Sequence, residues 1–134
     1  MIVADTNVIA YLSIEGEHTA LAERVMRQDA EWIAPLLWRS EFRNLLLLHV
    51  RQEWFGLDHA LKLLEQAEQF MFGREHIVSS APVMNLAIRS GCSAYDCEFV
   101  VLAQEIGVPL VTSDQKILSA FSDVAVSMNR FVST

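Results

Sequence analysis

Residues 2–7 read IVADTN, a short apolar and largely β-branched run that ends at an aspartate. This pattern predicts a buried strand over residues 2–4, directly before Asp5. Residues 109–114, PLVTSD, repeat the pattern and end at Asp114. Ligands bind at the carboxyl ends of the strands in open α/β sheets. We therefore expect Asp5 and Asp114 to project into one crevice.

The chain around these two aspartates alternates between strand-like and helical patterns. Apolar spacing, prolines and glycines predict helices over the ranges Thr6–Ser13, Thr19–Gln28, Pro35 to about Gln52, Leu57–Phe72, Pro82–Gly91, Ser93–Gly107 and one more after Asp114. Further short strands are expected at Trp32–Ile33, at His76–Val78 and in the final VAV, residues 124–126. Such alternation predicts an α/β fold with three layers, α/β/α, around a mainly parallel central sheet.

Length and composition indicate one domain over residues 1–134. The chain is 52% hydrophobic and contains no linker rich in Pro, Gly and Ser. No apolar run approaches the roughly 18 residues that span a bilayer, and Asp5 interrupts any signal-peptide core. We therefore expect a cytoplasmic protein with no membrane segment. Cys92 and Cys97 lack the spacing of a zinc site or a disulfide framework, so we expect free thiols.

The net charge of −7 disfavours a simple nucleic-acid-binding module, because such affinity comes mainly from Lys and Arg. Acidic charge is compatible with a nuclease when it gathers at a site for divalent cations. Asp96 in the first turn of its helix and Glu41 among apolar neighbours are candidates to join the two strand-end aspartates. The alternatives are helix capping for the aspartates and, for Glu41, an ion pair with Arg39 or Arg43.

Four clustered carboxylates require a cation. Two unit charges about 4 Å apart repel by roughly 4 kcal/mol at an effective dielectric constant of about 20. Mg²⁺ or Mn²⁺ suits an all-oxygen ligand set, whereas the absence of a His/Cys cluster speaks against zinc. Such a metal ion activates water and stabilises charge during displacement at phosphorus. A metal ion held by these carboxylates is therefore suited to hydrolysis at phosphorus.

These acids stand in blocks that resemble the PIN-domain family, and in particular the VapC-type toxin ribonucleases of type II toxin–antitoxin systems. The blocks are VADTNV at 3–8, RSEFRN at 39–44, SAYDCEFVVLA at 93–103 and LVTSD at 110–114. DTN or TSD alone is a weak motif, but the ordered set is specific and spans nearly the whole chain. The resemblance implies a metal-dependent endoribonuclease with a PIN-like fold.

The resemblance also implies roles for single residues and for partners. Asp5 and Asp96 would be the principal metal ligands, and Glu41 and Asp114 would complete the site directly or through water. Hydrogen-bonding support would come from Asn7, Thr112 and Ser113. The implied partners are RNA, a VapB-type antitoxin and a second copy in a homodimer. Self-association is also favoured by the excess of apolar residues in LLLLHV, residues 45–50.

Several nearby residues have plainer interpretations. The aromatic side chains Trp38, Trp54 and Phe55 fit packing or an interface better than base stacking. Arg39, Arg43 and Lys116 flank the acids and could touch phosphates, although solvated helix faces commonly carry such residues. Glu98 is expected to point away from the site, toward solvent.

Two other functions compete with the nuclease. A haloacid-dehalogenase-type phosphatase is disfavoured because its DxDxT pattern needs a second aspartate, and Asn7 stands at that position. The stronger alternative is a PIN-like protein-binding module with little or no nuclease activity, since a fold does not guarantee a function.

Overall fold

A five-stranded sheet forms the centre of the protein, whose computed structural model describes residues 1–134. The strands are β1 (Ile2–Ala4), β2 (Trp32–Pro35), β3 (Glu75–His76), β4 (Leu110–Val111) and β5 (Ala125–Val126). Their spatial order is β3-β2-β1-β4-β5, and every neighbouring pair is parallel. All strands therefore end at the same edge of the sheet.

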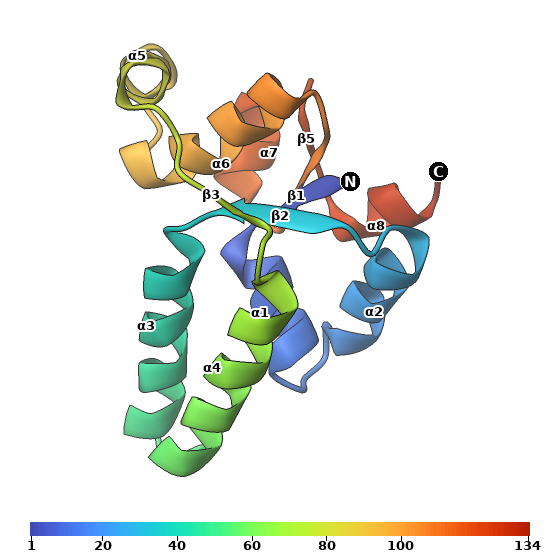
Figure 1. Ribbon diagram of the computed structural model, residues 1–134. Coiled ribbons are helices and arrows are strands. Elements are labelled where there is room, and N and C mark those ends of the chain that lie inside the picture. Colours follow the sequence, from blue (N-terminus) through green and yellow to red (C-terminus); the bar gives the residue numbers. More distant parts are fainter.

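Helices cover both faces of this sheet. They are α1 (Thr6–Ser13), α2 (Thr19–Gln28), α3 (Trp38–Arg51), α4 (Leu57–Met71), α5 (Ser80–Ser90), α6 (Ala94–Ile106), α7 (Gln115–Ala120) and α8 (Met128–Val132). Figure 1 shows α1 to α4 and α8 on one side of the sheet and α5 to α7 on the other. The predicted α/β/α architecture is confirmed. None of the helices is both long and apolar enough to cross a membrane.

The core lies between the sheet and its two helical layers. Every residue of β1 and β2 is buried, as expected for parallel strands covered on both faces. The largest fully buried side chains are Trp32, Trp38, Phe42 and Phe99. Gly91 and Gly107 end α5 and α6 with φ angles of 74° and 79°, which confirms the helix ends expected at these glycines.

Neither of the two prolines that were expected to begin a helix is the first residue of one. Pro35 is the last residue of β2, and α3 begins at Trp38. The missing N–H of Pro35 does not weaken the pairing with β3, because Ala34 and Leu36 donate to the neighbouring carbonyls instead. Pro82 is the third residue of α5, where no intrahelical donor is needed, so the helix starts at Ser80.

Two smaller differences concern short elements. The third strand occupies Glu75–His76 and excludes Ile77 and Val78, and a terminal helix, α8, was not anticipated. Both elements depend on distant partners, since β3 pairs with β2 and α8 packs on α2. Local patterns of five residues or fewer carry little information about such contacts.

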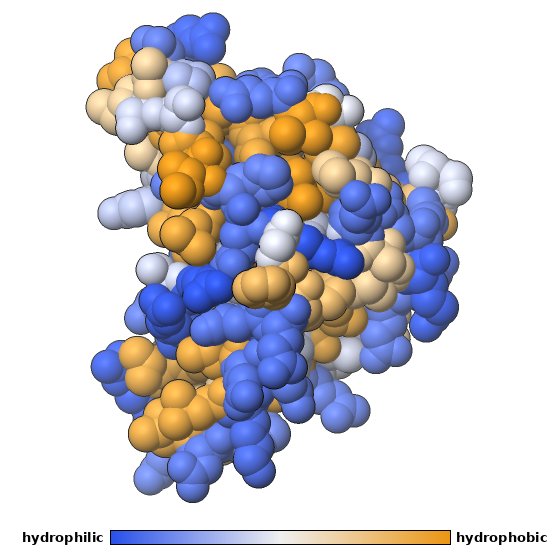
Figure 2. Space-filling model, viewed as in Figure 1, coloured by the Kyte–Doolittle hydropathy of each residue, from blue (hydrophilic) through white to orange (hydrophobic).

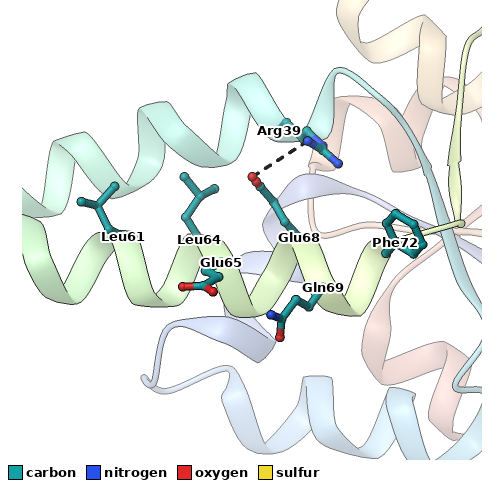
Figure 3. A pocket seen from close by; sticks show the side chains of 7 residues that line it. All are labelled: Arg39, Leu61, Leu64, Glu65, Glu68, Gln69 and Phe72. Atoms are coloured by element: carbon teal, nitrogen blue, oxygen red, sulfur yellow. Dashed lines mark ion pairs between the residues drawn. The ribbon is translucent and has the colours of Figure 1, made fainter.

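A partly buried charge network joins the start of α3 to β3 and α4. The Arg39 guanidinium donates to both Glu75 carboxylate oxygens, at 2.5 and 2.7 Å, and Trp38 Nε1 donates to the same carboxylate at 2.7 Å. Arg39 also forms a longer ion pair, 3.9 Å, with Glu68 on α4; Figure 3 shows it beside a shallow pocket along that helix. These bonds fix the first turn of α3, which also carries Glu41.

We predict that Glu75→Gln lowers the free energy of unfolding by about 2 kcal/mol, because it removes the charged acceptor of bonds from Trp38 and Arg39. Urea unfolding at pH 7 measures this loss. Hydrogen bonding from Arg39 lowers the pKa of Glu75. The stability from this ionised carboxylate is therefore present above the unfolded pKa and is lost as the pH falls through the lower folded value.

Glu68→Gln is the matched control, because its ion pair with Arg39 is long and should contribute less than about 1 kcal/mol. Equal losses from the two substitutions, or a Glu75→Gln loss that persists fully at pH 2, would contradict the assignment.

Candidate active site

The two central strands, β1 and β4, form the point where the order of the sheet reverses. The chain builds outward from β1 to β2 and β3, then returns to the other side of β1 with β4 and β5. Ala4 and Val111, the last residues of the central strands, are paired in register. A crevice at such a position is the usual ligand site of an open α/β sheet. Residues that follow these two strands are therefore placed side by side.

Asp5 follows β1 directly, and the residue is only 8% exposed. Its Oδ1 accepts a hydrogen bond from the Thr6 backbone N–H at 2.8 Å, which caps α1. Its Oδ2 accepts from the hydroxyl of Thr112, which follows β4, at 2.7 Å. The carboxylate is thus held between the ends of both central strands.

Asp114 lies three residues beyond β4 and caps α7. Its Oδ1 accepts from the backbone N–H groups of Lys116 and Ile117, at 2.9 and 3.2 Å. The capping interpretation therefore describes both strand-end aspartates correctly. It does not exclude a ligand role, because a carboxylate has about four lone-pair sites and the cap of α7 uses only Oδ1.

Glu41 reaches the same region from the first turn of α3. Its Oε1 accepts a hydrogen bond from the Thr6 hydroxyl at 2.6 Å. Thr6 therefore binds Asp5 through its backbone and Glu41 through its side chain. The expected alternative, an ion pair of Glu41 with Arg39 or Arg43, is not present, since the ion pairs of Arg39 are with Glu75 and Glu68. Sequence reasoning missed Thr6, whose only signal was its position next to Asp5.

The three polar residues expected to support the site all make contacts there. The Thr112 hydroxyl, besides donating to Asp5, accepts from the Asp114 backbone N–H at 3.0 Å. Asn7 donates to Asp5 Oδ2 at 3.5 Å and accepts from the Ser113 N–H at 3.4 Å. These hydrogen bonds link the ends of β1 and β4 into one rigid corner.

The four carboxylates repel one another electrostatically. Burial raises the pKa of Asp5 to about 6, and repulsion from Asp96 and Asp114 adds to it, while hydrogen bonds from Thr112 and Thr6 oppose it. Burial raises the pKa of Glu41, with repulsion from Asp5 and Asp96. Burial also raises the pKa of Asp96, with repulsion from Asp114. All four acids therefore share one electrostatic environment.

Glu98 does not face solvent as expected. It is half-buried and lines a hollow of about 360 Å³ with residues from β3 and α5, including His76 and Val83. Burial raises the pKa of Glu98, and its charge contributes to the raised pKa of Glu41. Asp96 and Glu98, near the start of α6, therefore both contribute to the raised pKa of Glu41.

The side chains that could bind a ligand here are carboxylates, with hydroxyl and amide groups around them. In the present arrangement no three His, Cys, Asp or Glu side chains converge closely enough to hold a metal ion. The donor chemistry fits a hard divalent cation, because carboxylate oxygens are its preferred ligands and a positive ion relieves the repulsion.

Known proteins resemble this chain in both sequence and fold. The family described as PIN domain matches residues 2–126. Ribonuclease VapC3 of Pyrobaculum aerophilum is 32% identical over 124 residues, covering 90% of this chain and 94% of that protein. The crystal structure of PAE2754, also from Pyrobaculum aerophilum, superposes with a TM-score of 0.78 at 16% identity and covers 98% of this chain and 86% of that chain. The resemblance is confirmed: this chain belongs to the PIN-domain family.

Proposed function

We propose that this protein is a metal-dependent endoribonuclease that hydrolyses RNA phosphodiester bonds, with residues 1–134 forming one PIN domain. The observation that supports the proposal is that Asp5 and Asp114 follow the two central strands at the switch point of the sheet, and that repulsion acts between these acids and Glu41 and Asp96. A relative that shares 32% identity over most of its length is named a ribonuclease, which supports the same chemistry here.

Asp5 and Asp96 would hold Mg²⁺ or Mn²⁺ most directly, with Glu41 and Asp114 binding it directly or through water. A bound divalent ion supplies an activated water and stabilises negative charge on the phosphate oxygens. The residues of the chain provide the orientation. Thr112 and the Thr6 backbone fix the Asp5 carboxylate, and the Thr6 hydroxyl fixes Glu41.

We further propose that a VapB-type antitoxin blocks this site, making the protein the toxin of a type II pair. A groove of about 330 Å³ runs between α1, the α1–α2 loop and α3, from Asn7 toward His49. It offers apolar side chains and the exposed carboxylates of Glu15 and Glu17. An amphipathic segment carrying arginine fits this lining, and a guanidinium would be attracted to the carboxylate cluster.

Self-association into a homodimer stays a prediction. It is supported by large apolar side chains at the surface, among them Ile77, Ile88 and Trp54, which are 91%, 84% and 65% exposed. Figure 2 shows apolar surface both near α5 and on the α3–α4 hairpin. Patches of this kind commonly mark interfaces.

We predict that Asp5→Asn stabilises the metal-free protein at high pH. The folded-state pKa of Asp5 is raised from 3.8 to about 6, so the wild type loses stability as the pH rises from about 4 to about 7. A shift of about 2 units corresponds to about 3 kcal/mol, and the substitution should recover about 2 kcal/mol at pH 8 in EDTA. Urea unfolding at pH 4 and pH 8 measures the difference.

Asp123→Asn, at an exposed position in the loop before β5, is the control. It should change the free energy of unfolding by no more than about 0.5 kcal/mol at either pH. Mg²⁺ should stabilise the wild type more than Asp5→Asn. An effect of Asp5→Asn that is identical at both pH values would show that the charge of Asp5 is not the cause.

We predict that Asp96→Asn lowers the rate of RNA cleavage by more than about a hundredfold, since it removes a principal metal ligand. Glu105→Gln, an exposed substitution on the same helix, should keep full activity. The assay follows labelled RNA on a denaturing gel with Mg²⁺ or Mn²⁺, and circular dichroism checks folding. Undiminished cutting in excess EDTA, or a fully active Asp96→Asn protein, would refute the metal-dependent site and favour a protein-binding role.

Expression of the wild type alone should slow bacterial growth, and co-expression of the neighbouring antitoxin gene should restore it. Asp5→Ala should remove the toxicity, while Asp123→Ala should keep it. Growth curves with immunoblots for equal protein levels measure both effects. If the wild type is harmless, or if Asp5→Ala is as toxic as the wild type, the toxin assignment is wrong even where RNA cleavage is found.

A further inference from the structure

Three basic residues were expected near the carboxylates, and the structure separates them. Arg39 is engaged by Glu75 and Glu68 on the α3–α4 side. Arg43 is exposed on α3 and takes part in no ion pair. Lys116 influences a carboxylate of the cluster directly, since its charge opposes the raised pKa of Asp96.

The fold holds Lys116 between two of the four acids. It is the second residue of α7, and its backbone N–H donates to Asp114 Oδ1 at 2.9 Å. Its Nζ donates to the Gly91 carbonyl at 3.4 Å, in the loop that leads into the helix carrying Asp96. The Lys116 side chain therefore extends from the residue next to the Asp114 cap to the loop that precedes α6.

The ammonium group nevertheless remains available to a ligand. Lys116 is exposed and forms no ion pair, and its single hydrogen bond is long. A bond of this length at an exposed position is exchanged easily for a charged partner. Lysine also binds phosphate well as a point charge.

We propose that the Lys116 ammonium binds a phosphate oxygen of the RNA backbone next to the bond that is cut. This inference rests on the proposed ribonuclease function and assigns one element of substrate binding to the same site. A polyanion approaching a chain of net charge −7 needs local positive charge. Lys116 supplies it on the α6–α7 side, beside Asp114 and Asp96.

The test compares binding of a fluorescein-labelled 12-nucleotide single-stranded RNA by Asp5→Asn and by Asp5→Asn/Lys116→Gln, with Mg²⁺ present. The proposed mechanism leaves both proteins unable to cut. Fluorescence anisotropy should give a Kd about fivefold higher for the double variant at low salt. The slope of log affinity against log salt should fall by about 0.7, the value for one phosphate contact on a single strand.

Lys116→Arg should restore both values, and Lys62→Gln, an exposed substitution on α4 across the sheet, should leave them unchanged. In the otherwise native enzyme, Lys116→Gln should raise KM about fivefold with kcat within about twofold. A purely structural role through Gly91 predicts a lower melting temperature with an unchanged salt slope.

An unchanged Kd and salt slope in the double variant would overturn the role of Lys116, as would failure of Lys116→Arg to restore them. RNA fragments produced by Asp5→Asn would instead reject the proposed carboxylate site. In that case the salt dependence of kcat/KM for Lys116→Gln decides the inference by the same criterion.

Discussion

A buried carboxylate at the end of the central strand is the constraint on which the site depends. Asp5 is 8% exposed, and its raised pKa shows that the fold tolerates its negative charge at a cost. Hydrogen bonds from Thr112 and the Thr6 N–H offset part of this cost. The completely buried strands around it supply the apolar stability that allows an unfavourable charge to persist. Stability and function therefore pull in opposite directions at this position.

The sequence was most informative where a local pattern has one physical meaning. A short apolar run followed by Asp predicted both strand-end positions, because parallel strands place their carboxyl ends at one edge. The helix ends at Gly91 and Gly107 were predictable for a similar reason, since glycine readily adopts the left-handed conformation that closes a helix. Asp96 and Glu41 needed the family resemblance in addition, because acids on helices are common for unrelated reasons.

The sequence was least informative where contacts join distant segments. The bond from Thr6 to Glu41 spans 35 positions and exists because α3 packs beside α1. No spacing rule anticipates it. Pro35 illustrates the same limit, since its role depends on the pairing of β2 with β3 rather than on its own preference for helix starts. Glu98 was expected to face solvent because helical geometry alone does not reveal the hollow that residues from β3 and α5 form beside it.

The distribution of charge explains how an acidic chain can still accept an anion. Arg39 is neutralised by Glu75 and Glu68, whereas Arg43 on α3 is exposed and forms no ion pair. Under the proposed function, attraction beside the acids would come from a cation held by the carboxylates and from the Lys116 ammonium near Asp96. Both are local, and both act only within about 10 Å at 0.1 M salt. Under the proposed function, binding would favour a phosphate that reaches the carboxylates over polyanions that meet the acidic surface elsewhere.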